Sequence, residues 1–463
     1  MIARPGPEGT GRAGKVLMLD FLKVLTSVIP TVCLLLMVYQ YLYMIHGLFV
    51  KPPKYADQKP QRYAVMICAR NEEKVVPHLV RSILEQDYPA ELIRIFVCAD
   101  NCTDHTADAA RAAGAVVYER SNRILQGKGH ALNYLLKQID QDYNIDSFDG
   151  FAIFDADNLL EKNYFTELNK VFNHPCRVVT TYRNSKNYGD NWISACSGLW
   201  FVREARFINQ VRSGLGFSCL VSGTGYVIHR DVIRANNGWH YFLLTEDVDF
   251  STNNILANEK IGYCRTAIFF DEQPTRLIDT WNQRMRWTKG FYQVFGRYGL
   301  RLIARMFTGR SYTLQGDPLP AEKMTAKERW TRFGTCYDVI FTLTPGYLFL
   351  ISAISMVINI LLGMKGNYSM TTQAPRVAMT LIPMLIGAYA GFYIIAIITV
   401  LAEWKNIYCS PGKKIGFTFV FPLFMFIYIP MTVLALFFRI RWKPIAHNVS
   451  VDMDSVRKQQ TGK

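Results

Sequence analysis

The chain has 463 residues, of which 50% are apolar, and its 52 Lys and Arg against 37 Asp and Glu give a net charge of +15. A slightly positive mean hydropathy argues against a wholly soluble protein. The excess of basic residues suggests nucleic-acid binding at first. However, the basic residues cluster beside an apolar run, where binding to anionic lipid headgroups explains them better. The ten cysteines form no CxxC pair and no Cys/His cluster, which argues against a zinc module and fits reduced thiols.

Four long apolar runs predict membrane helices. They cover residues 24–50, 339–364, 377–402 and 415–438. Each approaches or exceeds the roughly 20 residues that cross a bilayer core, and the last three contain no Asp, Glu, Lys or Arg. The first run is too long for the core of a signal peptide. We therefore expect an uncleaved anchor over residues 1–51, three transmembrane helices over 336–440, and a polar, at most partly ordered tail over 441–463.

Residues 60–290 have the pattern of an α/β domain. Short apolar runs predict strands at 63–69, 93–99, 116–118 and 151–154, and amphipathic segments between them predict helices at 74–86, 106–113 and 129–138. Alternation of strands and helices predicts βαβ units and a mostly parallel sheet. Ligands of such sheets bind at the carboxyl ends of the strands, where polar residues follow the first, second and fourth predicted strands.

Residues 291–335 alternate basic and apolar side chains at helical spacing. Between Arg297 and Arg332, eight Lys and Arg stand against three acidic residues, directly before an apolar run. Such juxtamembrane segments bind anionic headgroups with about 1 kcal/mol per charge, so we expect one or two basic amphipathic helices in the membrane interface. The alternative is an ordinary basic face in contact with water.

Asp155 and Asp157 follow the fourth predicted strand directly. Carboxylates at a strand end can hold Mg²⁺ or Mn²⁺, which prefer oxygen ligands and often keep a substrate phosphate in their shell. Because side chains alternate along an extended chain, Asp157 is the expected metal ligand, while Asp155 contacts the ribose or orders the loop. On its own, such a pair would more often be an acidic turn.

Two other segments could contact a nucleotide. Asp100 ends the second strand and can accept hydrogen bonds from a base or a ribose, although nearby Asp104 fits a helix cap equally well. Lys128 lies between Gly127 and Gly129 and offers one cation, on a flexible backbone, to a diphosphate or a uracil carbonyl. Alone, this segment is little more than a turn.

Thr245, Glu246 and Asp247 follow the apolar residues 241–244. Displacing a nucleoside diphosphate from a sugar with inversion requires a carboxylate that takes the proton of the acceptor hydroxyl, and Asp247 is the candidate for this base. Its apolar surroundings would raise its pKa toward a useful value. A helix capped by Thr245, with acidic residues in its first turn, explains the segment equally well.

Gln283, Arg286 and Trp287 share one face of a predicted helix. Arg286 can neutralise a leaving diphosphate with two hydrogen bonds, and Trp287 can offer a flat ring to a sugar. Alone, these residues also fit an Arg/Trp helix in a membrane interface.

The order and spacing of these motifs resemble glycosyltransferase family 2, in its membrane-integrated branch of chitin, hyaluronan, cellulose and poly-N-acetylglucosamine synthases. The resemblance covers about residues 62–290 and the layout of the flanking spans. It implies a GT-A fold, an α/β nucleotide-sugar domain with a mostly parallel sheet, joined to an α-helical transmembrane region. It also implies the following roles: Asn71, Glu72, Asp100 and Lys128 near the nucleotide; Asp155 and Asp157 at the UDP and the metal; Glu246, Asp247 and Arg286 in catalysis, with Asp247 as the base; and Gly223, Thr224, Gly225, Gln283 and Trp287 near the acceptor.

We therefore expect an enzyme that moves a hexose or N-acetylhexosamine from a UDP-sugar to a growing β-linked polysaccharide, with Mg²⁺ or Mn²⁺ as cofactor. Transfer of a single sugar to a lipid acceptor is the alternative, and a non-catalytic membrane scaffold is the third possibility. The expected partners are the UDP-sugar, a carbohydrate or lipid-linked acceptor and membrane lipids, with no nucleic acid. The expected location is a bacterial plasma membrane, with the catalytic domain in the cytoplasm.

A cytoplasmic domain followed by three crossings would put the C-terminus outside. The loop at 403–414, which carries three lysines, would then lie inside, as the positive-inside rule requires. Arg439, Arg441 and Lys443 are also basic and favour the inside for the tail, so one of the three segments could instead be re-entrant.

Overall fold

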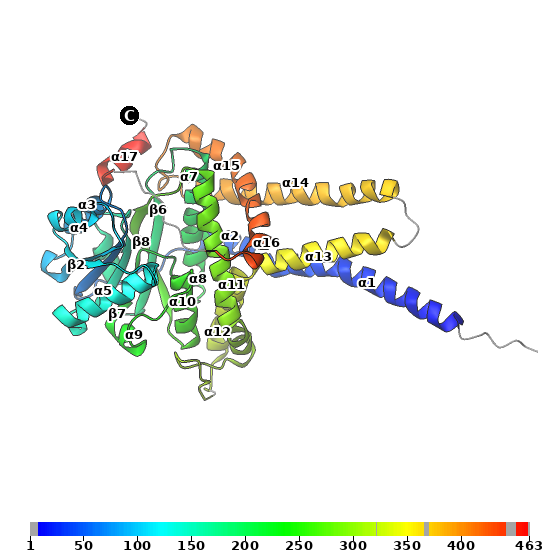
Figure 1. The fold of residues 1–463 in the computed structure, drawn as a ribbon, viewed down its shortest axis with the longest axis horizontal. Helices are drawn as coiled ribbons and strands as arrows, with labels where there is room; N and C mark the ends of the chain where they lie inside the picture. Colours follow the sequence, from blue (N-terminus) through cyan, green and yellow to red (C-terminus); the bar gives the residue numbers. More distant parts are fainter. Residues whose placement is uncertain (1–7, 321, 365–369, 441–450, 462–463) are drawn as a thin grey trace, which may run out of the picture.

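The computed structural model describes residues 8–320, 322–364, 370–440 and 451–461. Its centre is an eight-stranded sheet in the order β3-β2-β1-β4-β7-β6-β8-β5 (Figure 1). The strands are β1 (Tyr63–Ala69), β2 (Ile93–Asp100), β3 (Val116–Arg120), β4 (Gly150–Asp155), β5 (Leu159–Leu160), β6 (Val178–Ser185), β7 (Tyr226–His229) and β8 (Ile261–Asp271). The four strands β3, β2, β1 and β4 are parallel, as are β6 and β8, which confirms the prediction of a mostly parallel sheet. β5 and β7 run antiparallel to their neighbours.

Helices cover both faces of the sheet, which explains the continuous apolar run of β1. Val65 and Ile67 pack in one core with α3, α4 and α6, while Ala64 and Met66 pack in another with α5. A strand buried on both faces needs apolar side chains at every position. The helices of this domain are α3 (Val76–Leu84), η1 (Ala90–Leu92), α4 (Thr106–Ala112), α5 (Lys128–Tyr143), η2 (Ile145–Ser147), α6 (Tyr164–Asn169), α9 (Arg230–Ala235) and α10 (Glu246–Leu256).

A second group of helices lies between the sheet and the apolar helices. It comprises α7 (Trp192–Arg203), the π-helical segment η3 (Glu204–Asn209), α8 (Gln210–Gly214), α11 (Leu277–Thr308) and α12 (Ala326–Leu343). The basic segment predicted as interfacial helices forms the second half of α11 and the first half of α12. α12 runs past residue 339, where a membrane span was predicted to begin, because Asp338 forms a buried ion pair with Arg212 of α8 (Oδ2–Nε 2.6 Å). The apolar helix begins at Pro345 instead.

Within the described residues, four segments are long and apolar enough to cross a membrane: Leu17–Phe49, Pro345–Leu362, Ile382–Ala402 and Pro411–Phe437. They belong to α1 (Glu8–Met37) with α2 (Tyr39–Phe49), to α13 (Pro345–Met364), to α14 (Met370–Ala402), and to α15 (Pro411–Phe426) with α16 (Tyr428–Phe437). Figure 1 shows α1, α13 and α14 projecting in one direction from the rest of the protein. α15 and α16 instead run across the base of these helices, where α15 contacts α7 and α16 contacts α11.

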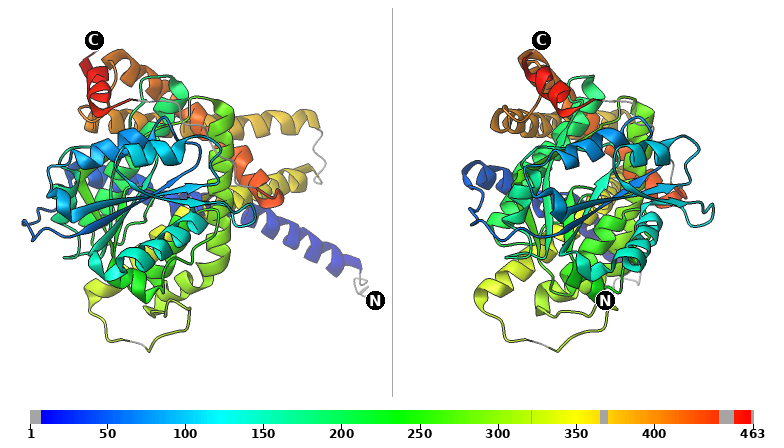
Figure 2. Two further views of the ribbon diagram at one scale, coloured as in Figure 1. Left: turned by 60° about the vertical axis from the view of Figure 1, so that its left-hand side comes forward. Right: turned by 90° about the vertical axis from the view of Figure 1, so that its left-hand side faces the viewer.

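The last described segment lies against the sheet. In α17 (Met453–Thr461), Val456 is buried beside Leu159 and Phe270, and Arg457 forms an ion pair with Glu161. Figures 1 and 2 show the ribbon of α17 beside the sheet domain. The sheet and α17 are therefore on the same side of any membrane, which three crossings between them would not allow. This placement favours the alternative that one of the three apolar segments is re-entrant and does not cross the membrane. The segment α15–α16 fits this alternative, because it runs across the base of the projecting helices. Of the predicted polar tail, residues 441–450 and 462–463 lie outside the described residues.

Candidate functional site

The carboxyl ends of β1 and β2 bring three predicted donor residues to one edge of the sheet. Asn71 follows β1 in a left-handed conformation (φ 58°), and its Oδ1 accepts the N–H of Thr103 at 2.8 Å. Glu72, next to it, is buried. Asp100 ends β2 and pairs with Arg120 (Oδ1–Nη1 2.5 Å); burial raises the pKa of Asp100, and Arg120 opposes this effect. The edge thus presents an amide and two carboxylates where ligands of parallel sheets bind.

Lys128 joins the end of β4 to the SGTG loop (residues 222–225). Its Nζ forms an ion pair with Asp155 and donates a hydrogen bond to the carbonyl of Gly223 at 2.6 Å. Burial lowers the pKa of Lys128, but nearby carboxylates, led by Asp155, outweigh it and raise that pKa, so the amine stays charged. The N–H of Asp155 also donates to Oγ1 of Thr224 at 2.9 Å. Two residues of the loop are therefore fixed to the end of β4.

The three loop residues predicted to contact an acceptor differ in their surroundings. Gly223 faces the second acidic motif, since a Cβ built on it would lie 3.7 Å from Oδ2 of Asp247. Thr224 is buried against β4. Gly225 adopts φ 65°, and a side chain there would overlap the ring of Phe269, so packing accounts for this glycine. Gly223 is thus the loop position best placed to meet an acceptor.

Asp157 is buried and held by its neighbours. Its Oδ2 accepts the N–H of Glu272 at 2.8 Å, its Oδ1 lies 3.3 Å from Nδ2 of Asn158, and its carbonyl accepts from Nζ of Lys186 at 3.0 Å. Among the described residues, no three or more His, Cys, Asp or Glu gather as a metal cage. One carboxylate fits Mg²⁺ or Mn²⁺ that takes its other ligands from water and a substrate phosphate.

Glu246 and Asp247 begin α10. Thr245 stands at the N-cap position with acidic residues in the first turn, as the alternative explanation expected, but its side chain makes no capping hydrogen bond and its Oγ1 has no partner within the described residues. Burial, together with the charge of Asp247, raises the pKa of Glu246 to about 7, against the opposing charges of Lys128 and Arg286. Burial raises the pKa of Asp247 as well. A buried carboxylate pair whose pKa values are both raised suits proton transfer.

The structure separates the two arginines of the QRMRW segment on α11. Gln283, Arg286 and Trp287 are partly exposed, and Arg286 is among the charges that act on the Glu246–Asp247 pair. Arg284 is fully buried. Its guanidinium donates to the hydroxyl of Tyr428 and lies 4.5 Å from the centre of the Phe424 ring. Arg284 therefore fastens α11 to α15 and α16, whereas Arg286 is partly exposed and acts on the acidic pair.

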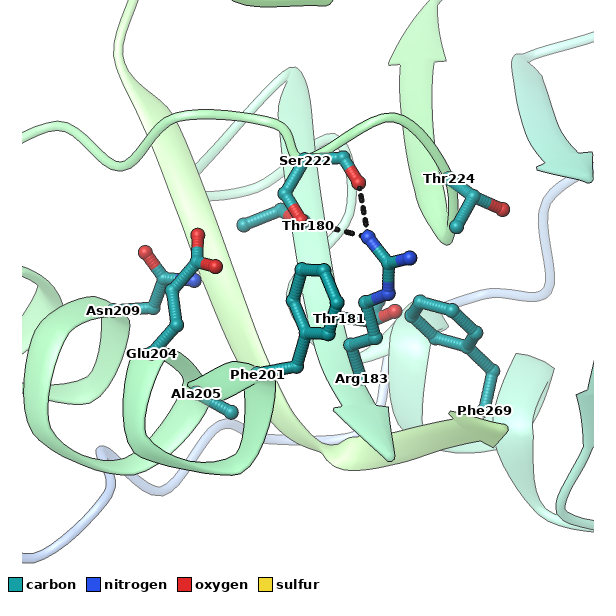
Figure 3. A pocket seen from close by; sticks show the side chains of 10 residues that line it. All are labelled: Thr180, Thr181, Arg183, Phe201, Glu204, Ala205, Asn209, Ser222, Thr224 and Phe269. Atoms are coloured by element: carbon teal, nitrogen blue, oxygen red, sulfur yellow. Dashed lines mark hydrogen bonds between the residues drawn. The ribbon is translucent and has the colours of Figure 1, made fainter. Parts of the chain in front are cut away.

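Two charged side chains that the sequence did not single out line a small cavity beside the SGTG loop (Figure 3). Arg183 of β6 reaches the loop at Ser222 and pairs with Asp271. Glu204 lies at the first position of η3, and burial raises the pKa of its carboxyl group. π-Helical segments occur often at functional sites but have no sequence signature, so sequence alone gave no reason to select Glu204.

Comparisons with known proteins identify the family of the α/β domain. A family model described as "Glycosyltransferase like family 2" matches residues 60–290. A beta-monoglucosyldiacylglycerol synthase of Synechocystis sp. is 28% identical over 242 residues, covering 50% of this chain and 48% of that protein. A poly-beta-1,6-N-acetyl-D-glucosamine synthase of Staphylococcus epidermidis is 21% identical over 254 residues, covering 53% of this chain and 58% of that protein. The chain thus spans about half the length of the curated relatives it matches.

Among solved structures, the mannosyltransferase PcManGT from Pyrobaculum calidifontis, in complex with GDP-Man and Mn²⁺, has the same fold. The TM-score is 0.52 at 15% sequence identity, and the match covers 82% of this chain and 98% of that chain. At this identity the likeness concerns the fold alone.

Proposed function

Since this chain belongs to glycosyltransferase family 2, we propose that it is an inverting enzyme that moves a hexose or an N-acetylhexosamine from a UDP-sugar to an acceptor at the membrane. The observation that carries the proposal is the position of Asp247, whose Oδ2 lies 3.7 Å from a Cβ built on Gly223 of the SGTG loop. Lys128 and Arg286 supply positive charge to the same region.

In the proposed reaction, Asp247 takes the proton of the acceptor hydroxyl as its oxygen attacks the anomeric carbon. The bond to the diphosphate breaks on the opposite face, which inverts the configuration. A general base contributes about 10²- to 10⁴-fold to such a step, and a raised pKa makes the carboxylate a stronger base near neutral pH. Glu246 shares with Asp247 the proton that the pair takes up. Arg286 stabilises the negative charge of the leaving diphosphate.

For the donor, Asn71, Glu72 and Asp100 would line the nucleotide end of the site, and Lys128 and Asp155 would lie at the diphosphate and ribose. Asp157 would hold Mg²⁺ or Mn²⁺. When bound, the ion supplies positive charge that neutralises the diphosphate as it leaves. The buried carboxylate of Asp157 supports this use of a metal, which would take water and phosphate as its further ligands.

For the acceptor we favour a growing β-linked polysaccharide, contacted by Gln283 and Trp287. The resemblance to membrane-integrated synthases supports it, as does a relative named as a poly-beta-1,6-N-acetyl-D-glucosamine synthase. A lipid acceptor is the second candidate, and two observations favour it. A more similar relative is named as a beta-monoglucosyldiacylglycerol synthase, and α11, which carries the acceptor residues, packs directly on apolar α16.

For the membrane arrangement, we place α1, α13 and α14 across a bacterial plasma membrane and α15–α16 in its inner interface. The sheet, α17 and the loop with Lys405, Lys413 and Lys414 then all lie in the cytoplasm, together with Arg439. Three crossings satisfy the positive-inside rule at every one of these positions. The contact of α17 with the sheet supports this arrangement over four crossings.

The test is UDP release by detergent-purified protein with UDP-glucose, UDP-N-acetylglucosamine, UDP-glucuronic acid and UDP-galactose, each with MgCl₂ or MnCl₂. A product of high molecular weight on a gel supports the polysaccharide. A single-sugar product that requires added dioleoylglycerol supports the lipid acceptor. Folded protein that releases no UDP from any donor refutes the proposed transfer.

A further inference from the structure

Arg183 contacts three parts of the site at once. Its Nε donates to Oδ2 of Asp271 at 2.6 Å, and its Nη1 donates to the carbonyl of Ser222 at 3.0 Å (Figure 3). Its guanidinium carbon lies 3.6 Å from the centre of the Phe201 ring, and that ring contacts Trp287 edge-on at 5.9 Å. With Nη2, which also pairs with Asp271, these contacts use three nitrogens and the flat face of one planar group, which a lysine cannot do.

On one side, Arg183 reaches the predicted metal ligand through β8. Asp271 is the last residue of β8, and its Oδ1 accepts a second hydrogen bond, from Nε2 of Gln273 at 2.7 Å. The next residue, Glu272, donates its N–H to Oδ2 of Asp157 at 2.8 Å. The segment that holds Arg183 is therefore the same segment that orients Asp157.

On the other side, Arg183 holds the SGTG loop together with Lys128. The carbonyl of Ser222 accepts from Arg183, and the next carbonyl, that of Gly223, accepts from Lys128 at 2.6 Å. Two consecutive carbonyls bound by two cations leave this part of the loop little freedom. Gly223 is also the position that faces Asp247, so a shift of the loop would change the space in front of the base.

The Arg183–Asp271 ion pair is shielded from water, since the two side chains are 14% and 2% exposed. Salt screens buried pairs much less than exposed ones, and a bond to a charged partner fixes geometry more strongly than a neutral one. Removing Arg183 would leave the carboxylate of Asp271 buried without its main partner.

Resting on the transferase function proposed above, we propose that Arg183 is a positioning residue, which fixes the SGTG loop relative to the metal ligand Asp157. Through this link the acceptor hydroxyl, the base and the donor carbon meet in the correct geometry. Backbone pairing with β6 and the bond between Glu272 and Asp157 hold the end of β8 without Arg183, so Arg183 acts on the loop and the acceptor step and leaves binding of the nucleotide to other residues.

The test compares Arg183→Gln and Arg183→Lys with the wild type. Arg177→Gln is the matched control. Arg177 directly precedes the first residue of β6, whereas Arg183 lies near its last residue, and Arg177 pairs with Glu259. Calorimetry with UDP and MnCl₂ measures the donor site. Initial rates of UDP release, with donor and acceptor varied separately, measure transfer to dioleoylglycerol in micelles or to an N-acetylglucosamine oligosaccharide.

Arg183→Gln is expected to lower kcat over acceptor KM by about 10- to 100-fold, the loss typical of one hydrogen bond to a charged group. Its affinity for UDP with Mn²⁺ should equal that of the wild type. Arg183→Lys keeps the charge without the planar fork and should recover part of the loss. Arg177→Gln should behave as the wild type. Adding Asp271→Asn to Arg183→Gln should cause little further loss, because both act through one link.

Two results would overturn the inference while leaving the proposed function intact. If Arg183→Gln loses UDP–Mn²⁺ binding in the same proportion as activity, Arg183 is a donor ligand or a folding residue. If its rates equal those of the wild type, it is dispensable. A wild-type protein that binds UDP but releases none from any donor instead refutes the proposed function, and the inference falls with it.

Discussion

Replacing Gly290 with alanine tests whether the position of the base, and not only its identity, sets the rate of transfer. Gly290 lies about one turn after Trp287 on α11 and packs against Thr245, which directly precedes Glu246 and Asp247. A Cβ on Gly290 would lie 2.5 Å from both Oγ1 and Cγ2 of Thr245, whereas ordinary contact begins at 3.4 Å. The two segments must therefore separate by about 0.9 Å, the difference between these distances.

A displacement of about 1 Å at a reacting group can cost about 100-fold in rate, so kcat of Gly290→Ala should fall by about that factor. Stability should change little. Overpacking costs about 1–3 kcal/mol, while alanine in a helix gains about 1 kcal/mol over glycine, which leaves a net loss of about 0–2 kcal/mol. UDP–Mn²⁺ binding should change less than kcat, because Asn71, Asp100 and Asp157 lie on other elements and only Arg286, the proposed diphosphate contact, shares α11 with Gly290.

The assay is UDP release beside thermal unfolding, with Gly296→Ala as the control on the same helix. A Cβ on Gly296 meets no described atom within 4 Å, so this variant should gain about 1 kcal/mol of stability and keep the wild-type rate. Adding Thr245→Ala to Gly290→Ala removes both close contacts and should restore part of the lost rate. The reasoning is refuted if Gly290→Ala turns over as fast as Gly296→Ala.

Asp247→Asn should lower transfer by about 10²- to 10⁴-fold and keep UDP binding, and an equal loss of UDP binding would make Asp247 a structural residue. Burial and the charge of Asp247 raise the pKa of Glu246 to about 7, so the rate should fall as the pair is protonated below that pH. Glu246→Gln removes one negative charge and should move this acidic limb of the pH–rate profile to lower pH; an unmoved limb would contradict the coupling. Asp157→Ala should abolish the stimulation of UDP release by MnCl₂ added back after EDTA, and retained stimulation would place the metal elsewhere. In membrane vesicles, added protease should reach a C-terminal tag and the catalytic domain from the same side, and access from opposite sides would disprove the contact of α17 with the sheet.

The strands that the sequence predicted, β1 to β4, are continuous apolar runs, and β7 is a short strand that was missed although it is also apolar on both faces. β6 escaped this pattern because Thr180 and Thr181 stand in its middle, although both are buried. Their burial depends on partners distant in sequence, since Oγ1 of Thr181 donates to the carbonyl of Gly225 at 2.7 Å and lies 2.9 Å from the hydroxyl of Tyr164. A local pattern cannot show that a polar side chain will be satisfied inside the protein.

The residues of the candidate site also fall into those that the sequence could predict and those that it could not. Residues at strand ends, such as Asp100 and Asp155, could be predicted because topology alone brings the ends of parallel strands together. The same rule says nothing of Arg183, whose partners Ser222 and Asp271 come from distant parts of the chain. Asp104, in contrast, makes a local contact that the sequence could predict. Its carboxylate accepts the N–H of Thr106 at the start of α4, as the helix-cap alternative proposed.

Hydropathy could not distinguish the helices that project from the protein from the pair that lies across their base, because both are equally apolar. The helix pair α15–α16 is tied to α11, through the hydrogen bond of Tyr292 to the carbonyl of Thr432 and through the contacts of Arg284 with Phe424 and Tyr428. A buried guanidinium needs these partners, so α11 cannot move without α15 and α16. Arg286 and Trp287 stand on the same turns of α11 as Arg284. The position of the helix pair α15–α16 therefore affects the position of the proposed diphosphate and acceptor residues. In the proposed function, the helix pair that we place in the lipid interface would therefore help to position the active site.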